Sequence, residues 1–194
     1  MKSCEAITKK YASSNYVSSP QKISYRELKN LSDEVFIALH GRPGEDGAIQ
    51  EKLDELNLPY NGSNKNSSSI TIDKYRTNEI LKQNGMNVAE HILITNEEWK
   101  NEKEKFAEIL KNQIKYPFIA KPVDDGCSSA VKKIKSRAEF DAFAELIFRK
   151  QEALLQNWAQ VIHLKDKEEF PQKNVILVEE LVNKNGAKHF LEIT

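Results

Sequence analysis

Two lysines, Lys74 and Lys121, are suited to hold a phosphate group. Lys121 stands inside the apolar run FIAKPV, and burying an ammonium group is costly unless its charge is paired. A phosphate is a natural partner, because the ammonium is a compact donor of charge-assisted hydrogen bonds. The alternative is a lysine that extends to solvent from an edge strand. Pro122 favours an edge strand or a strand end, because proline cannot donate a hydrogen bond to a neighbouring strand.

A histidine in a glycine-rich turn is a second candidate. His40 begins the segment HGRPGEDG, residues 40–47, directly after an apolar run. Glycines let backbone amides approach an anion, and Glu45 and Asp46 could orient the imidazole. The competing interpretation is a turn that only caps the following helix. The pattern alone leaves both interpretations open.

Two further segments place polar groups beside expected strands. The loop DDGCSSA, residues 124–130, could fold its amides over phosphates, although many hairpin turns have the same composition. Its Cys127 could be a reactive thiol, but nothing beside it in the sequence favours the thiolate. Glu179 and Glu180 follow an apolar run. They could accept from a ribose hydroxyl or an amino group, or they could form a solvated strand end.

Apolar patterning predicts the elements that position these residues. A buried strand over residues 35–41, the glycine-rich turn and a helix over residues 50–57 would form a βα unit of an open α/β sheet, whose ligand sites lie at the carboxyl ends of strands. Capping boxes are expected at Thr95 with Glu98 and at Ser136 with Glu139. Further strands are expected at residues 91–95, 117–123, 130–134 and 175–182, the middle two as a hairpin. Further helices are expected at residues 4–11, 25–32, 73–84 (ended by Gly85) and 136–157.

Two polar segments are expected to be loops. Residues 63–69 are rich in serine and asparagine, and we place the first domain boundary there. Residues 166–173 are charged and are expected to be exposed.

Composition excludes several classes of protein. The 194 residues suffice for one large or two small domains. The 29 basic and 29 acidic residues balance, which argues against a nucleic acid or an anionic membrane as partner. The widely spaced Cys4 and Cys127 argue against a disulfide framework and favour a cytoplasmic protein. No apolar run approaches the ~20 residues of a membrane span, and the first residues lack a signal-peptide core.

Taken together, these segments resemble the D-alanine–D-alanine ligases of the ATP-grasp superfamily. The strand and turn VFIALHGRPGEDG resemble the family's substrate-domain signature, which is the most specific of the matches. The other matching segments are PYNGS, IDKYRTNEILKQNGMNV, PFIAKPVDDGCSS and ILVEELV, in the expected order. Cys127, Ser129 and Ala130 depart from the serine, valine and glycine that are usual at these positions.

The resemblance implies an α/β (α+β) fold. Residues 1–67 would be the end of an open α/β N-terminal ligase domain, residues 68–181 the small ATP-grasp subdomain, and residues 182–194 the start of the large subdomain. The glutamate that holds the first substrate's ammonium group and the Mg²⁺ ligands are expected outside this chain. We therefore expect no metal ligands in it and no ligase activity from it alone.

The resemblance also implies roles for individual positions. Lys74 and Lys121 would contact ATP phosphates, and His40 would act beside the first amino acid and its acyl phosphate. The remaining implied cofactor-binding residues are Gly126, Cys127 and Ser128 over the phosphates, Glu179, Glu180, Leu181 and Val182 at the adenine and ribose, and Glu192 as a looser match.

The implied chemistry uses ATP and Mg²⁺ to convert one D-alanine to an acyl phosphate. The amine of a second D-alanine then attacks it, which yields a dipeptide for peptidoglycan precursor synthesis. The complete protein is expected to bind ATP and small amino acids and to be a homodimer. An ATP-grasp ligase of another substrate and a catalytically dead nucleotide-binding homologue are the alternatives.

Overall fold

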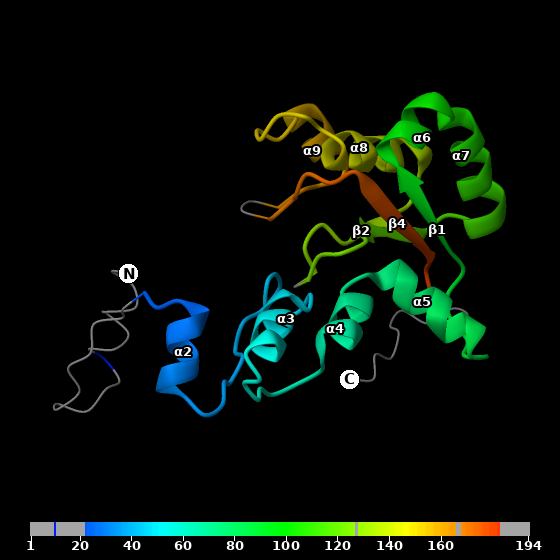
Figure 1. Cartoon of the computed structure of the whole chain (residues 1–194). Helices are drawn as coiled ribbons and strands as arrows, with labels where there is room; N and C mark the ends of the chain where they lie inside the picture. Colours follow the sequence, from blue (N-terminus) through cyan, green and yellow to red (C-terminus); the bar gives the residue numbers. More distant parts are fainter. Residues whose placement is uncertain (1–9, 11–21, 127, 166–167, 183–194) are drawn as a thin grey trace.

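The fold combines a four-stranded sheet with helices on both of its sides (Figure 1). The computed structural model describes Lys10 and residues 22–126, 128–165 and 168–182. In chain order the elements are α2 (Tyr25–Leu31), α3 (Ala48–Glu55), α4 (Lys65–Thr71), α5 (Lys74–Gln83), β1 (His91–Thr95), α6 (Asn96–Asn101), α7 (Lys103–Ile109), the π-helix η1 (Leu110–Ile114), β2 (Phe118–Pro122), β3 (Lys132–Ile134), α8 (Arg137–Ile147), α9 (Gln156–Val161) and β4 (Val175–Glu180).

The sheet has the strand order β1-β4-β2-β3, and every neighbouring pair is antiparallel. β2 and β3 form the expected hairpin, while β4 enters between β1 and β2. Lys121 pairs with Leu177, and Ile119 pairs with Glu179. Because β2 is an interior strand, the alternative that placed Lys121 on an edge strand is wrong. Pro122 is the last residue of β2, which is the strand-end position that proline tolerates.

The main hydrophobic core lies on one face of this sheet. Phe118 and Ala120 of β2 point to it together with Ile176 and Val178 of β4, and all four are fully buried. Helices α6 to α9 cover this face (Figure 1), and Phe140 packs edge-on against Phe118. Burying a side chain of this size contributes about 1.5–3 kcal/mol. Since side chains alternate along a strand, Lys121 and Glu179 lie on the opposite face.

Side-chain caps define several helix ends. Thr95 and Glu98 form the expected capping box at α6, and Asp73 caps α5 by accepting from the Arg76 N–H. Gly85 has a positive φ of 77°, as the end of α5 requires. The second expected box is only half formed. The Ser136 hydroxyl accepts from the Glu139 N–H, but the Glu139 carboxylate accepts from the Lys135 N–H.

The expected buried strand over residues 35–41 is wrong. Among the described residues only Val35 forms a β-bridge, to Tyr60, and the Asn61 side chain bonds to the backbone of Ile37. Phe36 is 79% exposed and Leu39 is 52% exposed. A strand needs neighbours to satisfy its backbone groups, and the described part of the chain supplies too few of them here. The short helix α2 and the helix α3 are confirmed at about their expected positions.

Three further expectations need correction. Residues 65–71 form helix α4, because the Asn64 side chain caps it by accepting from the Ser67 N–H. The helix expected to reach residue 157 ends at Ile147. Just after this end, the Arg149 guanidinium donates hydrogen bonds to the carbonyl oxygens of Leu146 and Phe170. In the charged segment 166–173, Phe170 is buried. Of the helix expected over residues 4–11, only Lys10 is described. In the part of the chain that the structure describes, no helix has the length and apolar character of a membrane span.

Candidate functional site

The centre of the candidate site is an ion pair between Lys121 and Glu179. The two residues lie on neighbouring strands, on the sheet face away from the main core. Their side chains are 19% and 15% exposed, so the pair is largely withdrawn from water. Asn78 of α5 donates a hydrogen bond of 2.9 Å to Glu179 Oε1. Lys121 is therefore held by β4, and β4 is tied to α5 at the same point.

Lys74 reaches this face from the first turn of α5. Its backbone N–H donates to the Val123 carbonyl oxygen over 3.0 Å, which joins the start of α5 to the end of β2. Its ammonium donates to the Asp125 carbonyl oxygen. Burial lowers the pKa of Lys74 and the charge of Lys121 lowers it further, although Asp125, Asp124 and Glu179 act in the opposite direction. The structure thus brings together the two lysines that sequence reasoning paired.

Two aspartates after β2 are bound by cations from distant segments. Lys173 Nζ lies 3.0 Å from Asp124 Oδ1 and 2.8 Å from Asp125 Oδ1. Arg42 Nη2 lies 2.9 Å from Asp124 Oδ2, and Arg42 Nη1 lies 3.0 Å from Asp46 Oδ2. Burial opposes ionisation of Asp124, but hydrogen bonds and charges from Lys173 and Arg42 prevail and lower its pKa. Burial likewise opposes the charge of Lys173, yet Asp125 and Asp124 raise its pKa.

His40 lies on an exposed turn at the border of this cluster. Its side chain is 88% exposed, and its Nδ1 lies 3.6 Å from Glu45 Oε1. Glu45 faces the imidazole as expected, while its other oxygen accepts from the Gly41 N–H. The expectation that Asp46 orients His40 is wrong, because Asp46 binds Arg42 and accepts from the Ala48 N–H. The turn needs glycine at position 47, where φ is 91° and a Cβ would lie 2.6 Å from the Lys65 carbonyl oxygen.

The expected phosphate loop lies close to this turn. A Cβ built on Gly126 would lie 3.8 Å from Glu45 Oε2, so the two segments approach each other. Ser128 is exposed with a φ of 57°, and Ala130 is buried with a φ of 50°. The resemblance places a glycine at the Ala130 position, and the left-handed backbone there is the conformation that glycine tolerates best. Cys127 and Glu192 lie outside the described residues.

The expected adenine edge lies at the end of β4. Glu180 is exposed, and its N–H donates to the Glu90 carbonyl oxygen over 2.8 Å. Leu181 is half-buried and Val182 is 67% exposed. Glu179 and Glu180 therefore differ, since Glu179 belongs to the ion pair and Glu180 is the solvated strand end.

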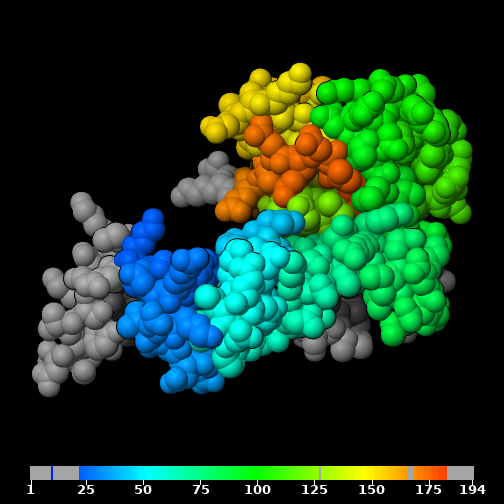
Figure 2. All heavy atoms as spheres, in the orientation of Figure 1, coloured from blue at the N-terminus to red at the C-terminus, as the bar shows by residue number. Residues whose placement is uncertain are grey.

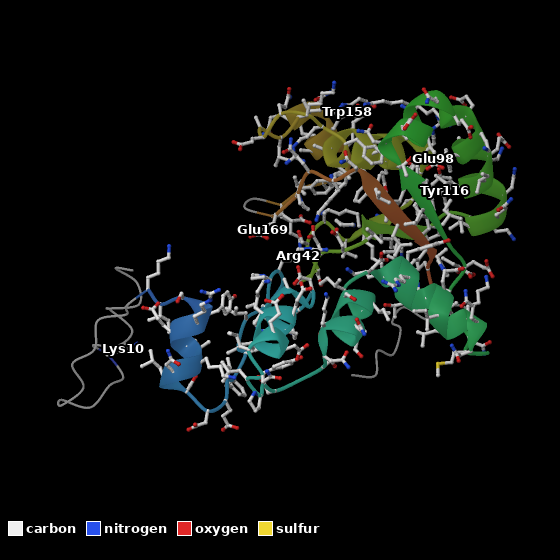
Figure 3. The ribbon with its side chains drawn as sticks, in the orientation of Figure 1. Lys10, Arg42, Glu98, Tyr116, Trp158 and Glu169 are labelled. Atoms are coloured by element: carbon white, nitrogen blue, oxygen red, sulfur yellow. The ribbon has the colours of Figure 1, made fainter. Side chains whose placement is uncertain are left out.

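Three residues of the cluster were missed by sequence reasoning: Arg42, Asn78 and Lys173. Arg42 occupies a variable position of the glycine-rich turn, and Figure 3 shows it between the lower helices and the loop after β2. Lys173 stands in a charged segment that was expected to be solvated. No sequence pattern singles out Asn78 or Lys173, because their roles come from contacts 101 and 48–49 positions apart in the chain.

A pocket of about 440 Å³ opens beside the glycine-rich turn, and its lining includes Leu39, Glu45, Gln50, Asn61 and Ser68. Lys74 and Lys121 do not line it, so the pocket is separate from the lysine pair. Within residues 22–126, 128–165 and 168–182, no group of three histidine, cysteine, aspartate or glutamate side chains is arranged to hold a metal ion.

The antiparallel sheet, covered by α6 to α9 on one face and carrying Lys121 beside Lys74 on the other, defines an α/β protein with a site suited to an anionic ligand. Comparison with known families identifies the family. A model described as "D-ala D-ala ligase N-terminus" matches residues 2–63, and one described as "D-ala D-ala ligase C-terminus" matches residues 80–165. The two matches together span more than half of the chain, and the chain belongs to the D-alanine–D-alanine ligase family.

Individual relatives agree with this assignment. A D-alanine--D-alanine ligase of Natranaerobius thermophilus is 36% identical over 107 residues, which are 55% of this chain and 29% of the relative. One of Acinetobacter baumannii is 37% identical over 126 residues, or 65% of this chain and 38% of the relative. The chain thus spans about a third of the length of these curated relatives.

Solved structures show the same fold. The D-alanine--D-alanine ligase of Bacillus anthracis, in complex with ATP, matches with a TM-score of 0.59 and 26% identity, over 81% of this chain and 43% of that one. The VanG D-Ala:D-Ser ligase of Enterococcus faecalis matches with a TM-score of 0.55 and 27% identity, over 78% of this chain and 36% of that one.

Proposed function

We propose that this chain is part of an ATP-dependent ligase that joins two D-alanine molecules through an acyl phosphate, for peptidoglycan precursor synthesis. The observation that carries the proposal is the state of Lys74. Its ammonium is partly buried, bonds to a carbonyl oxygen rather than a carboxylate, and has its pKa lowered by burial and by Lys121. An anionic ligand at this point would relieve both effects. The family membership and the ATP-bound relative support ATP as that ligand.

The roles proposed for individual residues are those that the family resemblance implies. Lys74 and Lys121 bind the phosphates, where an ammonium neutralises charge and orients an oxygen. His40 acts beside the first amino acid. The other residues in the proposed ATP site are Gly126, Cys127 and Ser128 over the phosphates, Glu179, Glu180, Leu181 and Val182 at the adenine and ribose, and Glu192.

The residues present fit the nucleotide better than the metal. Lys74 and Lys121 place two ammonium groups at one face of the sheet, where they can bind phosphates. The end of β4 is exposed at Glu180, where the base and ribose are proposed to bind. The described residues form no acidic metal cluster. Mg²⁺, when bound, would neutralise charge between the terminal phosphates of ATP. The work of this chain would be to bind and orient the phosphates.

Further properties of the complete protein are proposed on the resemblance alone. We propose that it works in the cytoplasm, binds small amino acids and forms a homodimer. We also retain the division into an N-terminal domain remnant over residues 1–67, a small subdomain over 68–181 and the beginning of a large subdomain over 182–194.

A nucleotide titration tests the proposal. The purified chain is titrated with ATP and, separately, with adenosine, and binding is followed by NMR. Lys74→Ala should weaken ATP binding by about 10- to 100-fold, because a hydrogen bond to a charged group contributes about 1.5–3 kcal/mol. Adenosine binding should be unchanged, and Lys100→Ala at the exposed end of α6, on the other side of the sheet, is the control. An equal loss for ATP and adenosine would contradict a phosphate role for Lys74.

A further inference from the structure

The two aspartates that follow β2 are held from three directions. Asp124 lies between Arg42, which comes from the glycine-rich turn, and Lys173, which comes from the segment before β4. Lys173 also binds the Asp125 carboxylate at 2.8 Å. The backbone carbonyl of the same Asp125 accepts from the Lys74 ammonium. These contacts form one continuous chain from Arg42 to Lys74.

The contacts that involve Lys173 are only partly open to solvent. Its side chain and that of Asp125 are each 23% exposed, and the side chain of Asp124 is 28% exposed. Pairs at this depth are screened less than pairs in open water. Arg42 is 50% exposed and has a second partner in Asp46. Lys173 is therefore the more buried of the two cations that bind Asp124, and Arg42 is the more exposed one.

The position of this cluster gives it a mechanical consequence. Asp125 is the residue just before Gly126, at the start of the proposed phosphate loop. With its carboxylate fixed by Lys173, the peptide carbonyl of Asp125 has a defined direction toward Lys74. Figure 2 shows the turn and α3, in cyan, directly beside the sheet, and Arg42 ties the two parts together there.

We propose that Asp124 and Lys173 are positioning residues that set the direction of the Lys74 ammonium by clamping the Asp124–Asp125 segment between Arg42 and the start of β4. The role assigned to both residues is to hold the Asp125 backbone. The inference rests on the proposed function, because it assigns Lys74 to the phosphates. It adds that the phosphate lysine and the His40 turn are anchored to adjacent residues, Lys74 to the Asp125 carbonyl oxygen and Arg42 to the Asp124 carboxylate.

A simpler role is possible for the same contacts, namely fold stabilisation without effect on Lys74. The two roles differ in what happens to the Lys74 ammonium when the clamp is cut. A stabilising pair alters only the free energy of unfolding. A positioning pair also alters the environment of Lys74 in the folded protein, and with it the phosphate-dependent part of ATP binding.

The experiment follows the ¹⁵Nζ signal of Lys74 in the 194-residue chain without ligand, assigned through its disappearance in Lys74→Ala. Asp124→Asn and Lys173→Met are compared with Lys173→Arg, which keeps the charge. Lys132→Met is the matched control. Lys132 lies on β3, and its Nζ forms a similarly buried ion pair with Glu168 Oε1 at 2.6 Å. Folding of each variant is checked by circular dichroism, and two separate cuts of the clamp are tested so that one unfolded variant does not decide the result.

We expect Asp124→Asn and Lys173→Met to shift the Lys74 signal and to weaken ATP binding by about three- to tenfold, with adenosine unaffected. Lys173→Arg should restore most of both, and Lys132→Met should change neither. An unchanged Lys74 signal in the folded cut variants would overturn the clamp. If the signal shifts but Lys74→Ala leaves ATP affinity intact, the clamp stands as a structural fact, while the phosphate role and the positioning role built on it are both refuted.

Discussion

Lys121 of β2 and Glu179 of β4 form an ion pair on the sheet face opposite the α6–α9 core. In the free protein, the Glu179 carboxylate balances the positive charge of Lys121. A phosphate that binds Lys121 must therefore share the ammonium with Glu179 or displace it. Asn78 keeps Glu179 in place from the other side, at 2.9 Å. The Glu179 carboxylate thus occupies the position on Lys121 that a phosphate would take. Competition between the carboxylate and a phosphate for Lys121 can be measured.

Removal of the Glu179 charge should strengthen the binding of a bare phosphate chain. Glu179→Gln keeps an oxygen that can accept from Asn78 but releases Lys121 from its counter-charge. Tripolyphosphate is the probe, since it lacks the base and ribose that Glu179 is proposed to face. Its affinity for the chain, measured by calorimetry, should rise by about two- to tenfold. A fall in affinity would show that Lys121 needs Glu179 for its orientation.

The two lysines should report on each other's charge. The pKa of Lys74 is lowered by burial and by Lys121. Lys121→Ala removes the second cause, so the pKa of Lys74 should move upward toward its ordinary value. An NMR titration of the Lys74 side chain measures this directly, with Lys100→Ala on α6 as the control that leaves it unchanged. No upward movement in Lys121→Ala would mean that the ammonium groups are too far apart to share one phosphate chain.

The ion pairs of Asp124 should make the free energy of unfolding depend on pH in the acidic range. The pKa of Asp124 is lower in the folded protein than in the unfolded one. Its contribution is therefore present above the unfolded value of about 3.9 and is lost as the pH falls through the lower folded pKa. At pH 7, Asp124→Asn should reduce the free energy of unfolding by about 1 kcal/mol. Urea unfolding should show this difference shrink as the pH is lowered below the unfolded value, and a difference independent of pH would contradict the assignment.

Local signals predicted much of the sheet domain. Thr95, Asp73 and Gly85 act through neighbours within a few positions, so the helix ends they mark were recoverable from the sequence. The strand FIAKP was also recoverable, because it combines an apolar run with a terminal proline. The interior place of β2 was not, since it depends on β4, which enters the sheet from more than 50 residues further along the chain.

The site divides in the same way. Lys74, Lys121 and Glu179 stand in recognisable segments, and the structure brings them to one face. Lys173 was missed because charged segments are usually solvated, and only its pairing with two aspartates withdraws it from water. The apolar run over residues 35–41 led to a wrong prediction of a buried strand. Its pattern is that of a buried strand, but burial depends on neighbours that a pattern within one segment does not contain.

A paired titration with ATP and adenosine tests whether Lys121 holds a phosphate of ATP. ATP and adenosine are titrated into the chain and its Lys121→Ala variant in a buffer that contains Mg²⁺, with chemical shifts read by NMR. We expect ATP binding to weaken by about 10- to 100-fold in the variant, while adenosine binding and the circular dichroism spectrum stay unchanged. An ATP affinity equal to that of the unmodified chain would contradict this expectation.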